Sequence, residues 1–238
     1  MVLEIKNYSL GLAETGKQIL DKANLVIDKG EIIVLVGENG SGKSSFALSL
    51  LGIPGYERVG SVKVGSKETL ELGIDEIAKT GLFVSFQSPP EIDGVSLYNF
   101  ISTGYKSIYG QNGLSSFKLR KKILETAKIV GLGENFLERS TNQGFSGGER
   151  RKSEVLQMLI LEPKVAILDE VDSGLDIKST ANIAKILRKT ANENQTAIIV
   201  ISHSPEFIKK LQPNKIIELR DQRFEEVSIE EIGKFAEE

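Results

Sequence analysis

The chain has 238 residues, of which 40% are hydrophobic and 26% are charged. This balance excludes a disordered chain and predicts one large domain with a full core and room for an inserted subdomain. Its 30 basic and 33 acidic residues give a net charge of −3, which argues against nucleic acid as the main partner. With no cysteine and one histidine, the polypeptide by itself is not expected to hold a zinc or iron–sulfur site.

Membrane insertion is not expected either. No stretch approaches the roughly 18 apolar residues that a membrane span needs, and residues 1–6 lack the long apolar region of a signal peptide. We therefore expect a cytoplasmic protein with no direct membrane insertion.

The N-terminal third predicts strands around a buried parallel sheet. Alternation at 3–6 and an apolar run at 24–27 predict an antiparallel β layer, whereas the unbroken aliphatic run 32–36 predicts a strand buried on both faces. A further buried strand is expected at 81–86. The turn residues of 88–94 predict that no strand continues there.

Helical periodicity then replaces the strand pattern up to about residue 162. Apolar strands return at 165–168 and 196–201, a hairpin is expected over 215–227, and Ser228 with Glu231 predicts the cap of a terminal helix. We expect a single domain, 1–238, made of a catalytic α/β subdomain, 1–91 and 163–238, and an inserted helical subdomain, 92–162.

Residues 37–44 read Gly-Glu-Asn-Gly-Ser-Gly-Lys-Ser and match the phosphate-binding P-loop pattern between a predicted strand and a predicted helix. Glycines let backbone N–H groups approach a phosphate closely, and the helix that follows directs its positive end at the same place. Lys43 supplies a point charge, Ser44 is expected to bind Mg²⁺, and Ser45 the α-phosphate. The expected nucleotide-binding residues are Gly37, Glu38, Asn39, Gly40, Ser41, Gly42, Lys43, Ser44 and Ser45.

The strand at 165–168 ends in two carboxylates, Asp169 and Glu170. Ligands of open α/β sheets bind at the carboxyl ends of strands, so both side chains are expected beside the P-loop. Asp169 would hold Mg²⁺ together with Ser44, and Glu170 would polarise the water that attacks the γ-phosphate. Alone, such a pair is more often a solvated strand end, but after a P-loop the catalytic interpretation is favoured.

Residues 145–149 read Phe-Ser-Gly-Gly-Glu and open a predicted helix. Ser146 and Glu149 form a capping box, so a purely structural role is one interpretation. Together with the P-loop and the carboxylate pair, the segment resembles the signature sequence of ATP-binding-cassette (ABC) ATPases. The resemblance implies that Ser146, Gly147 and Gly148 bind the γ-phosphate of ATP held by the P-loop of a second copy.

The same resemblance covers essentially the whole chain. It implies that Gln87 touches Mg²⁺ or the lytic water, that His203 contacts the γ-phosphate, and that Asp176 lies in a loop crossing the dimer interface. It implies a fold of the α/β class, a P-loop NTPase of the ABC type with a mainly parallel core sheet, an N-terminal antiparallel β layer and an inserted helical subdomain. It also implies Mg²⁺-dependent ATP hydrolysis.

One feature departs from the family pattern. Many ABC ATPases stack adenine on an aromatic residue of the early β layer, but residues 12–18 contain none and Tyr8 lies too early in the chain. The sequence therefore leaves base selectivity open.

Within the ABC family, residues 86–96, 144–149, 156–158 and 161–164 resemble the SufC ATPases of iron–sulfur cluster assembly. This resemblance implies SufB- and SufD-like scaffold proteins as partners and an ATP-dependent homodimer contact within the complex. The segments 149–152 and 172–176 differ from the forms common in transporters and favour this interpretation. The alternative is a nucleotide-binding subunit that energises a membrane transporter; a DNA-repair or chromosome ATPase is disfavoured because the chain has no long heptad insertion.

Overall fold

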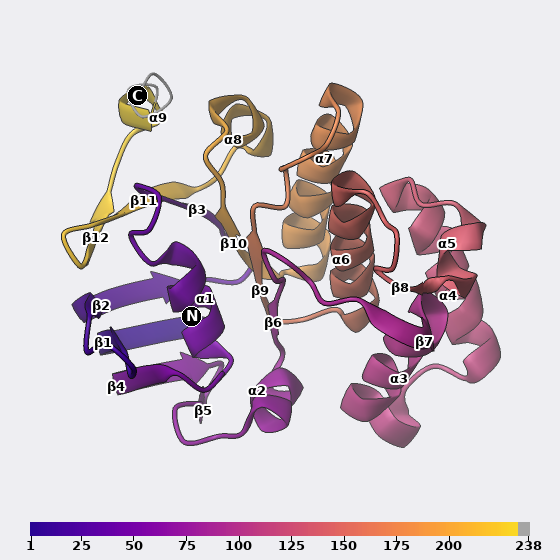
Figure 1. The fold of residues 1–238 in the computed structure, drawn as a ribbon, viewed down its shortest axis with the longest axis horizontal. Coiled ribbons are helices and arrows are strands. Elements are labelled where there is room, and N and C mark those ends of the chain that lie inside the picture. The colour runs from indigo at the N-terminus through magenta and orange to yellow at the C-terminus, as the bar shows by residue number, and fades with distance from the viewer. Residues whose placement is uncertain (233–238) are drawn as a thin grey trace.

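The computed structural model describes residues 1–232, whose elements surround a six-stranded sheet (Figure 1). Five of its strands are parallel, and β12 pairs antiparallel with β11 at one edge. The strand order is β12(Arg223–Glu226), β11(Lys215–Arg220), β3(Ile32–Val36), β10(Ala197–Ile201), β9(Val165–Asp169) and β6(Leu82–Val84). The predicted parallel sheet and closing hairpin are confirmed.

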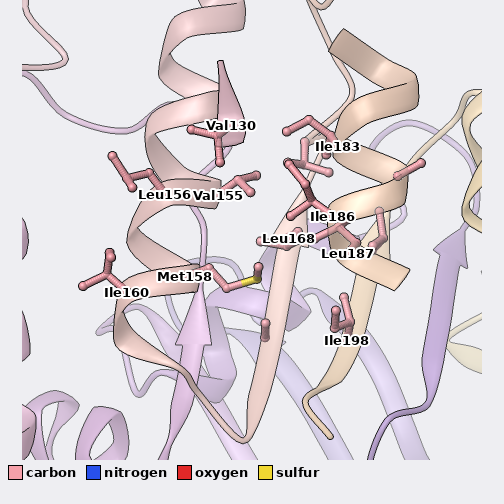
Figure 2. Packing of buried hydrophobic residues seen from close by; sticks show 14 of the residues in the cluster. Val130, Val155, Leu156, Met158, Ile160, Leu168, Ile183, Ile186, Leu187 and Ile198 are labelled. Atoms are coloured by element: carbon pink, nitrogen blue, oxygen red, sulfur yellow. The ribbon is translucent and has the colours of Figure 1, made fainter. Parts of the chain in front are cut away.

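The parallel strands are apolar throughout because both faces of the sheet are covered. On β3, Ile32 and Val34 join one hydrophobic cluster, whereas Ile33 and Leu35 join another on the opposite face. Figure 2 shows the first cluster, in which Leu168 of β9 lies among side chains of α6(Gly147–Leu161) and α7(Ile177–Asn194).

The second cluster joins the parallel sheet to an antiparallel sheet through α1(Lys43–Leu50). Phe46 of α1 is fully buried between the two sheets. The antiparallel sheet has the order β2(Gln18–Ile27), β1(Leu3–Leu12), β4(Tyr56–Val64) and β5(Lys67–Glu68). The predicted N-terminal β layer is thus confirmed, and it holds the P-loop helix from one side.

Between β6 and β9 the chain forms mainly helices, gathered away from the antiparallel sheet (Figure 1). They are α3(Leu97–Tyr109), the 3-10 helix η1(Gly110–Asn112), α4(Ser116–Val130), α5(Glu134–Glu138) and α6, with α2(Ile74–Thr80) preceding β6. These helices agree with the periodicity of the sequence. The bounds of the two subdomains stay a prediction.

The turn prediction for residues 88–94 was wrong in its second half. Residues from Ile92 onward form β7(Ile92–Ser96), which pairs antiparallel with β8(Ser140–Thr141) in a separate small sheet. The hydroxyl group of Thr141 also donates to the carbonyl oxygen of Val95 at 2.9 Å. The strand was missed because its partner lies far along the chain and its sequence has no alternating pattern.

The C-terminal part completes the layer over the first cluster. Helix α8(Pro205–Leu211) packs against α7, with Ser204 as its N-cap. Ser228 N–H donates to Glu231 Oε2 at 2.6 Å at the start of α9(Ile229–Ile232), as the predicted cap requires. Within residues 1–232, no helix is both long enough and apolar enough to cross a membrane.

Candidate nucleotide-binding site

The P-loop joins β3 to α1 in a conformation that needs glycine. Gly37, Gly40 and Gly42 have φ angles of 142°, 79° and 106°. At Gly42 an added Cβ would lie 2.2 Å from Cγ2 of Ile19, and at Gly37 it would lie 2.6 Å from the carbonyl oxygen of Leu219. Neighbouring strands therefore close on the loop at positions where only glycine fits.

An ammonium group and free backbone amides meet at the start of α1. The N-cap of this helix is a glycine with no side-chain cap, so the first N–H groups of the helix are left for a ligand. The side chain of Lys43 is buried, and its Nζ donates to the carbonyl oxygens of Gly37 and Glu38, both at 2.8 Å. Burial lowers the pKa of Lys43, and the carboxylates of Asp169 and Glu170 oppose that shift. This arrangement suits a bound polyanion.

A cavity of about 520 Å³ lies over this loop and collects residues from distant parts of the chain. Because β9 and β10 are parallel neighbours of β3, Glu170 and His203 reach the same sheet edge as the P-loop. The structure brings together these predicted residues around the cavity: Asn39, Gly40, Gly42, Lys43, Ser44, Ser45, Gln87, Glu170 and His203. The predicted Glu38 and Ser41 line an adjoining cavity of about 400 Å³ on the β11 side of the loop.

Ser44, which lines the cavity, and Asp169, which is hydrogen-bonded to Ser44 without lining the cavity, offer oxygen ligands. Asp169 is 2% exposed, and its Oδ1 has no hydrogen-bond partner among the described residues. Burial raises the pKa of Asp169, and a hydrogen bond with Ser44 partly offsets the shift. Mg²⁺ prefers carboxylate and hydroxyl oxygens, so this pair fits the predicted metal site. Gln87, the third predicted ligand, lines the cavity above it.

The two residues expected beside the γ-phosphate are held by the ends of β9 and β10. Glu170 has a positive φ of 50°, and its N–H donates to the carbonyl oxygen of Ile201 at 2.9 Å. His203 is exposed to the cavity. Partial burial and the nearby charge of Lys43 lower the pKa of His203, whereas Glu170 opposes the shift. A carboxylate and an imidazole with lowered pKa therefore face the same space.

The signature residues lie apart from this cavity in the same chain. Ser146 is the exposed N-cap of α6 and accepts from the N–H of Glu149 at 3.3 Å, so the capping box is present. Gly147 and Gly148 follow it without lining the P-loop cavity. Asp176 is exposed and caps α7, accepting from the N–H of Ser179 at 2.9 Å. One copy of the chain thus presents these residues outward.

Several residues near the site gave no signal in the sequence. Arg151 is buried on α6 and donates to the carbonyl oxygen of Gln87 at 2.9 Å. Ser85 at the end of β6 accepts from the N–H of Asp169 at 2.9 Å. Their contacts could not be predicted from sequence, because each side chain binds the backbone of a segment that is distant along the chain.

Tyr8, the aromatic residue nearest in sequence to the expected base-stacking position, lies in the hydrophobic core. Its side chain is fully buried, its hydroxyl group donates to Ser49 Oγ at 2.8 Å, and burial raises its pKa. Tyr8 is therefore a core residue that cannot stack on a base. Among the described residues, no aromatic side chain lines either cavity next to the P-loop.

Comparison with known proteins agrees with this geometry. A family model described as ABC transporter matches residues 20–173, well over half of the chain. The probable ATP-dependent transporter ycf16 of Cyanophora paradoxa is 37% identical over 237 residues, which cover 98% of this chain and 90% of that protein. ABC transporter I family member 6, chloroplastic, of Arabidopsis thaliana is 35% identical over 219 residues, which cover 90% of this chain and 64% of that protein.

A solved structure supports the fold independently. The dimeric post-hydrolysis state of an ATP-binding cassette, bound to ADP and Pi, superposes with a TM-score of 0.82 over 95% of this chain and 98% of that one, at 24% identity. The P-loop, the carboxylate pair and the family match agree with one another. The chain therefore belongs to the ABC transporter family and is a Mg²⁺-dependent ATPase that binds and hydrolyses ATP.

Proposed function

We propose that this ATPase drives conformational change in a soluble, cytoplasmic iron–sulfur cluster assembly scaffold made of SufB- and SufD-like proteins. The observation that carries the proposal is the likeness of residues 86–96, 144–149, 156–158 and 161–164 to SufC ATPases. These segments are β7 with the linker before it, the start of α6, and the second half of α6 with the turn that leads to β9. Apart from Gln87, these segments do not line the P-loop cavity, so they are free to determine what the ATPase acts on.

The nucleotide site supplies the driving step through a second copy of the chain. Lys43 and the P-loop amides bind the phosphates, with Ser44, Asp169 and Gln87 as the Mg²⁺ ligands. When bound, Mg²⁺ neutralises phosphate charge during transfer. Ser146 and Gly147 are exposed, Gly148 is partly exposed, and none of the three lines the P-loop cavity of its own chain. We assign them, with Asp176, to the ATP of the partner copy, so that ATP closes the dimer.

Hydrolysis then depends on residues at the sheet edge. Glu170 accepts a proton from the attacking water. His203 donates a hydrogen bond to the γ-phosphate through an N–H of its imidazole, which its lowered pKa favours in the neutral form. Loss of the γ-phosphate removes the contact that holds the two copies together. ATP binding and hydrolysis thereby become closing and opening of the dimer.

A place for the scaffold lies on the far side of Gln87. An apolar cavity of about 350 Å³ runs between α2, β6 and α3 and includes Ile74, Phe83, Phe86 and Ile108. Ile74 and Phe86 are 48% and 38% exposed and line the same apolar cavity, and clustered exposed apolar side chains mark interaction sites. We place the scaffold contact here and on the adjoining Pro89–Pro90 linker, because both connect directly to Gln87.

A second function, energising a membrane transporter, is favoured by the names of relatives that describe transporters. Purifying the native complex anaerobically and identifying the co-eluting proteins separates the two. The proposal predicts a partner that has no membrane spans and carries an iron–sulfur cluster. A partner with several membrane spans would overturn the scaffold role while leaving the ATPase assignment intact.

A further inference from the structure

Helix α6 carries a buried guanidinium group that joins three segments of the chain. The side chain of Arg151 is 8% exposed. It donates to the carbonyl oxygens of Phe86 and Gln87 at 3.0 and 2.9 Å, and to Ser173 Oγ at 3.2 Å. Phe86 and Gln87 precede the linker to the helical region, and Ser173 follows the catalytic carboxylates. One side chain thus connects α6, the Gln87 segment and the loop after β9.

Glu154, one turn further along the helix, completes this arrangement. Its side chain is 4% exposed; Oε2 accepts from Arg151 at 3.1 Å and Oε1 accepts from the N–H of Phe86 at 2.9 Å. The backbone of Phe86 is therefore held through both its N–H and its carbonyl group. A buried charge is costly unless its hydrogen bonds are made, so this pair is bound to its partners in one geometry.

The same helix begins at the residues assigned to the ATP of the second copy. Ser146 caps α6 five positions before Arg151. Close packing adds a second connection, because a Cβ at Gly148 would lie 2.9 Å from the carbonyl oxygen of Gly174. A displacement of the start of α6 is therefore transmitted to Ser173–Gly174 by packing and to Gln87 by hydrogen bonds.

We propose that Arg151 is a positioning residue that couples the two ATP sites of the dimer. When the start of α6 engages the ATP of the partner copy, Arg151 fixes Gln87 and the loop after Glu170 in the arrangement required for hydrolysis in its own site. The inference rests on the proposed dimer. The inference adds to the proposed dimer the residue through which ATP occupancy of one site controls turnover in the other.

A merely structural role for the buried pair would give a different result. Loss of a structural ion pair lowers the folded fraction and reduces activity in proportion. Loss of coupling instead makes the two sites independent, so the Hill coefficient for ATP falls from about 2 toward about 1 even in fully folded protein. The dependence of turnover on ATP concentration therefore separates the two roles.

The experiment compares four forms of the full chain, each with its native scaffold bound. Arg151→Met removes every donor of the side chain. Ser173→Ala removes one acceptor without leaving a buried unpaired charge, which keeps the test open if Arg151→Met folds poorly. Lys152→Met is the matched control, because it changes a cation to methionine at the next position of α6, on a partly exposed side chain.

We expect Arg151→Met to reduce turnover at saturating ATP at least tenfold and to bring the Hill coefficient close to 1, with Ser173→Ala shifted in the same direction. The affinity of the monomer for ATP stays unchanged, since Arg151 lies outside the P-loop cavity. The Lys152→Met control keeps the wild-type Hill coefficient.

Two results would overturn the coupling role. One is a wild-type Hill coefficient in folded Arg151→Met and Ser173→Ala proteins, and the other is a wild type without cooperativity. Failure of the Glu170→Gln form to dimerise with ATP would instead overturn the proposed ATP-closed dimer.

Discussion

Ser202 Oγ donates to Asp172 Oδ2 at 2.9 Å, which joins the end of β10 to the loop that follows β9. Ser202 is fully buried and also accepts from the N–H of Ser204 at 3.1 Å. His203 lies between these two serines, and Glu170 lies two positions before Asp172. This serine hydroxyl group therefore adds to the hydrogen bond from the N–H of Glu170 to Ile201 in fixing the relative position of Glu170 and His203.

Replacing Ser202 by alanine should reduce turnover about tenfold, which corresponds to a loss of about 1.4 kcal/mol in the transition state. The cause is a less well-ordered His203, since the P-loop is untouched. Steady-state ATP hydrolysis and calorimetric ATP binding measure the two effects separately. Asp172→Asn is the control: its amide oxygen can still accept from Ser202, so most activity should remain. Equal turnover in Ser202→Ala and wild type would contradict this role.

The pKa of His203 should lie below the ordinary value of 6.5, because partial burial and Lys43 both disfavour the imidazolium form. His203 is the sole histidine of the sequence, so NMR gives one imidazole titration to follow. At His203 the unfolded chain then binds more protons near pH 6.5 than the folded one, so the contribution of this residue to the unfolding free energy should fall as pH decreases through that range. Glu154, whose pKa burial raises to about 7, contributes in the opposite direction, so the imidazole titration itself is the measurement to follow. A titration midpoint at or above 6.5 would contradict the assignment.

Lys43→Ala should weaken ATP binding roughly 10- to 100-fold, since a hydrogen bond to a charged group contributes about 1.5–3 kcal/mol. The chain should still fold, because this side chain contacts loop carbonyls and not the hydrophobic core. Calorimetry with Mg-ATP measures the affinity, and circular dichroism the fold. The exposed Lys29→Ala variant should bind ATP as the wild type does. Unaltered affinity in Lys43→Ala would show that the phosphates bind elsewhere.

Tyr8→Phe separates a core role from a role in base binding. Loss of the hydrogen bond to Ser49 should lower the unfolding free energy by about 1 kcal/mol, while ATP affinity stays unchanged. Denaturant unfolding and nucleotide binding on the same sample test both statements. A weakened affinity for ATP with no loss of stability would place the tyrosine at the base after all.

Local patterns predicted the parts of the molecule that depend on local chemistry. The run 32–36 followed by the glycine loop was sufficient to predict β3, the P-loop and α1, because each depends on neighbours in sequence. Asp169 and Glu170 were found for the same reason, as a strand that ends in carboxylates. The sequence could equally predict that Ser146 caps a helix.

Contacts between distant segments could not be predicted in this way. Strand β7 depends on β8, and its pairing joins Ile92 to Thr141. Arg151 is buried on α6 because Gln87 and Ser173 approach it from distant segments, in addition to its pairing with Glu154 on the same helix. The family resemblance supplied Gln87 and His203, whose positions at one sheet edge the structure then explained.

The most direct test of the central claim is the mass of the Glu170→Gln protein in solution with saturating Mg-ATP, measured by analytical ultracentrifugation over a range of protein concentrations. Because Glu170 is assigned to hydrolysis and the phosphate contacts remain, ATP should persist and hold two copies together. We expect a dimer with ATP and a return to monomer with ADP or with the additional substitution Ser146→Arg. Protein that binds ATP fully yet stays monomeric at every concentration, alone and with its scaffold, would contradict the account.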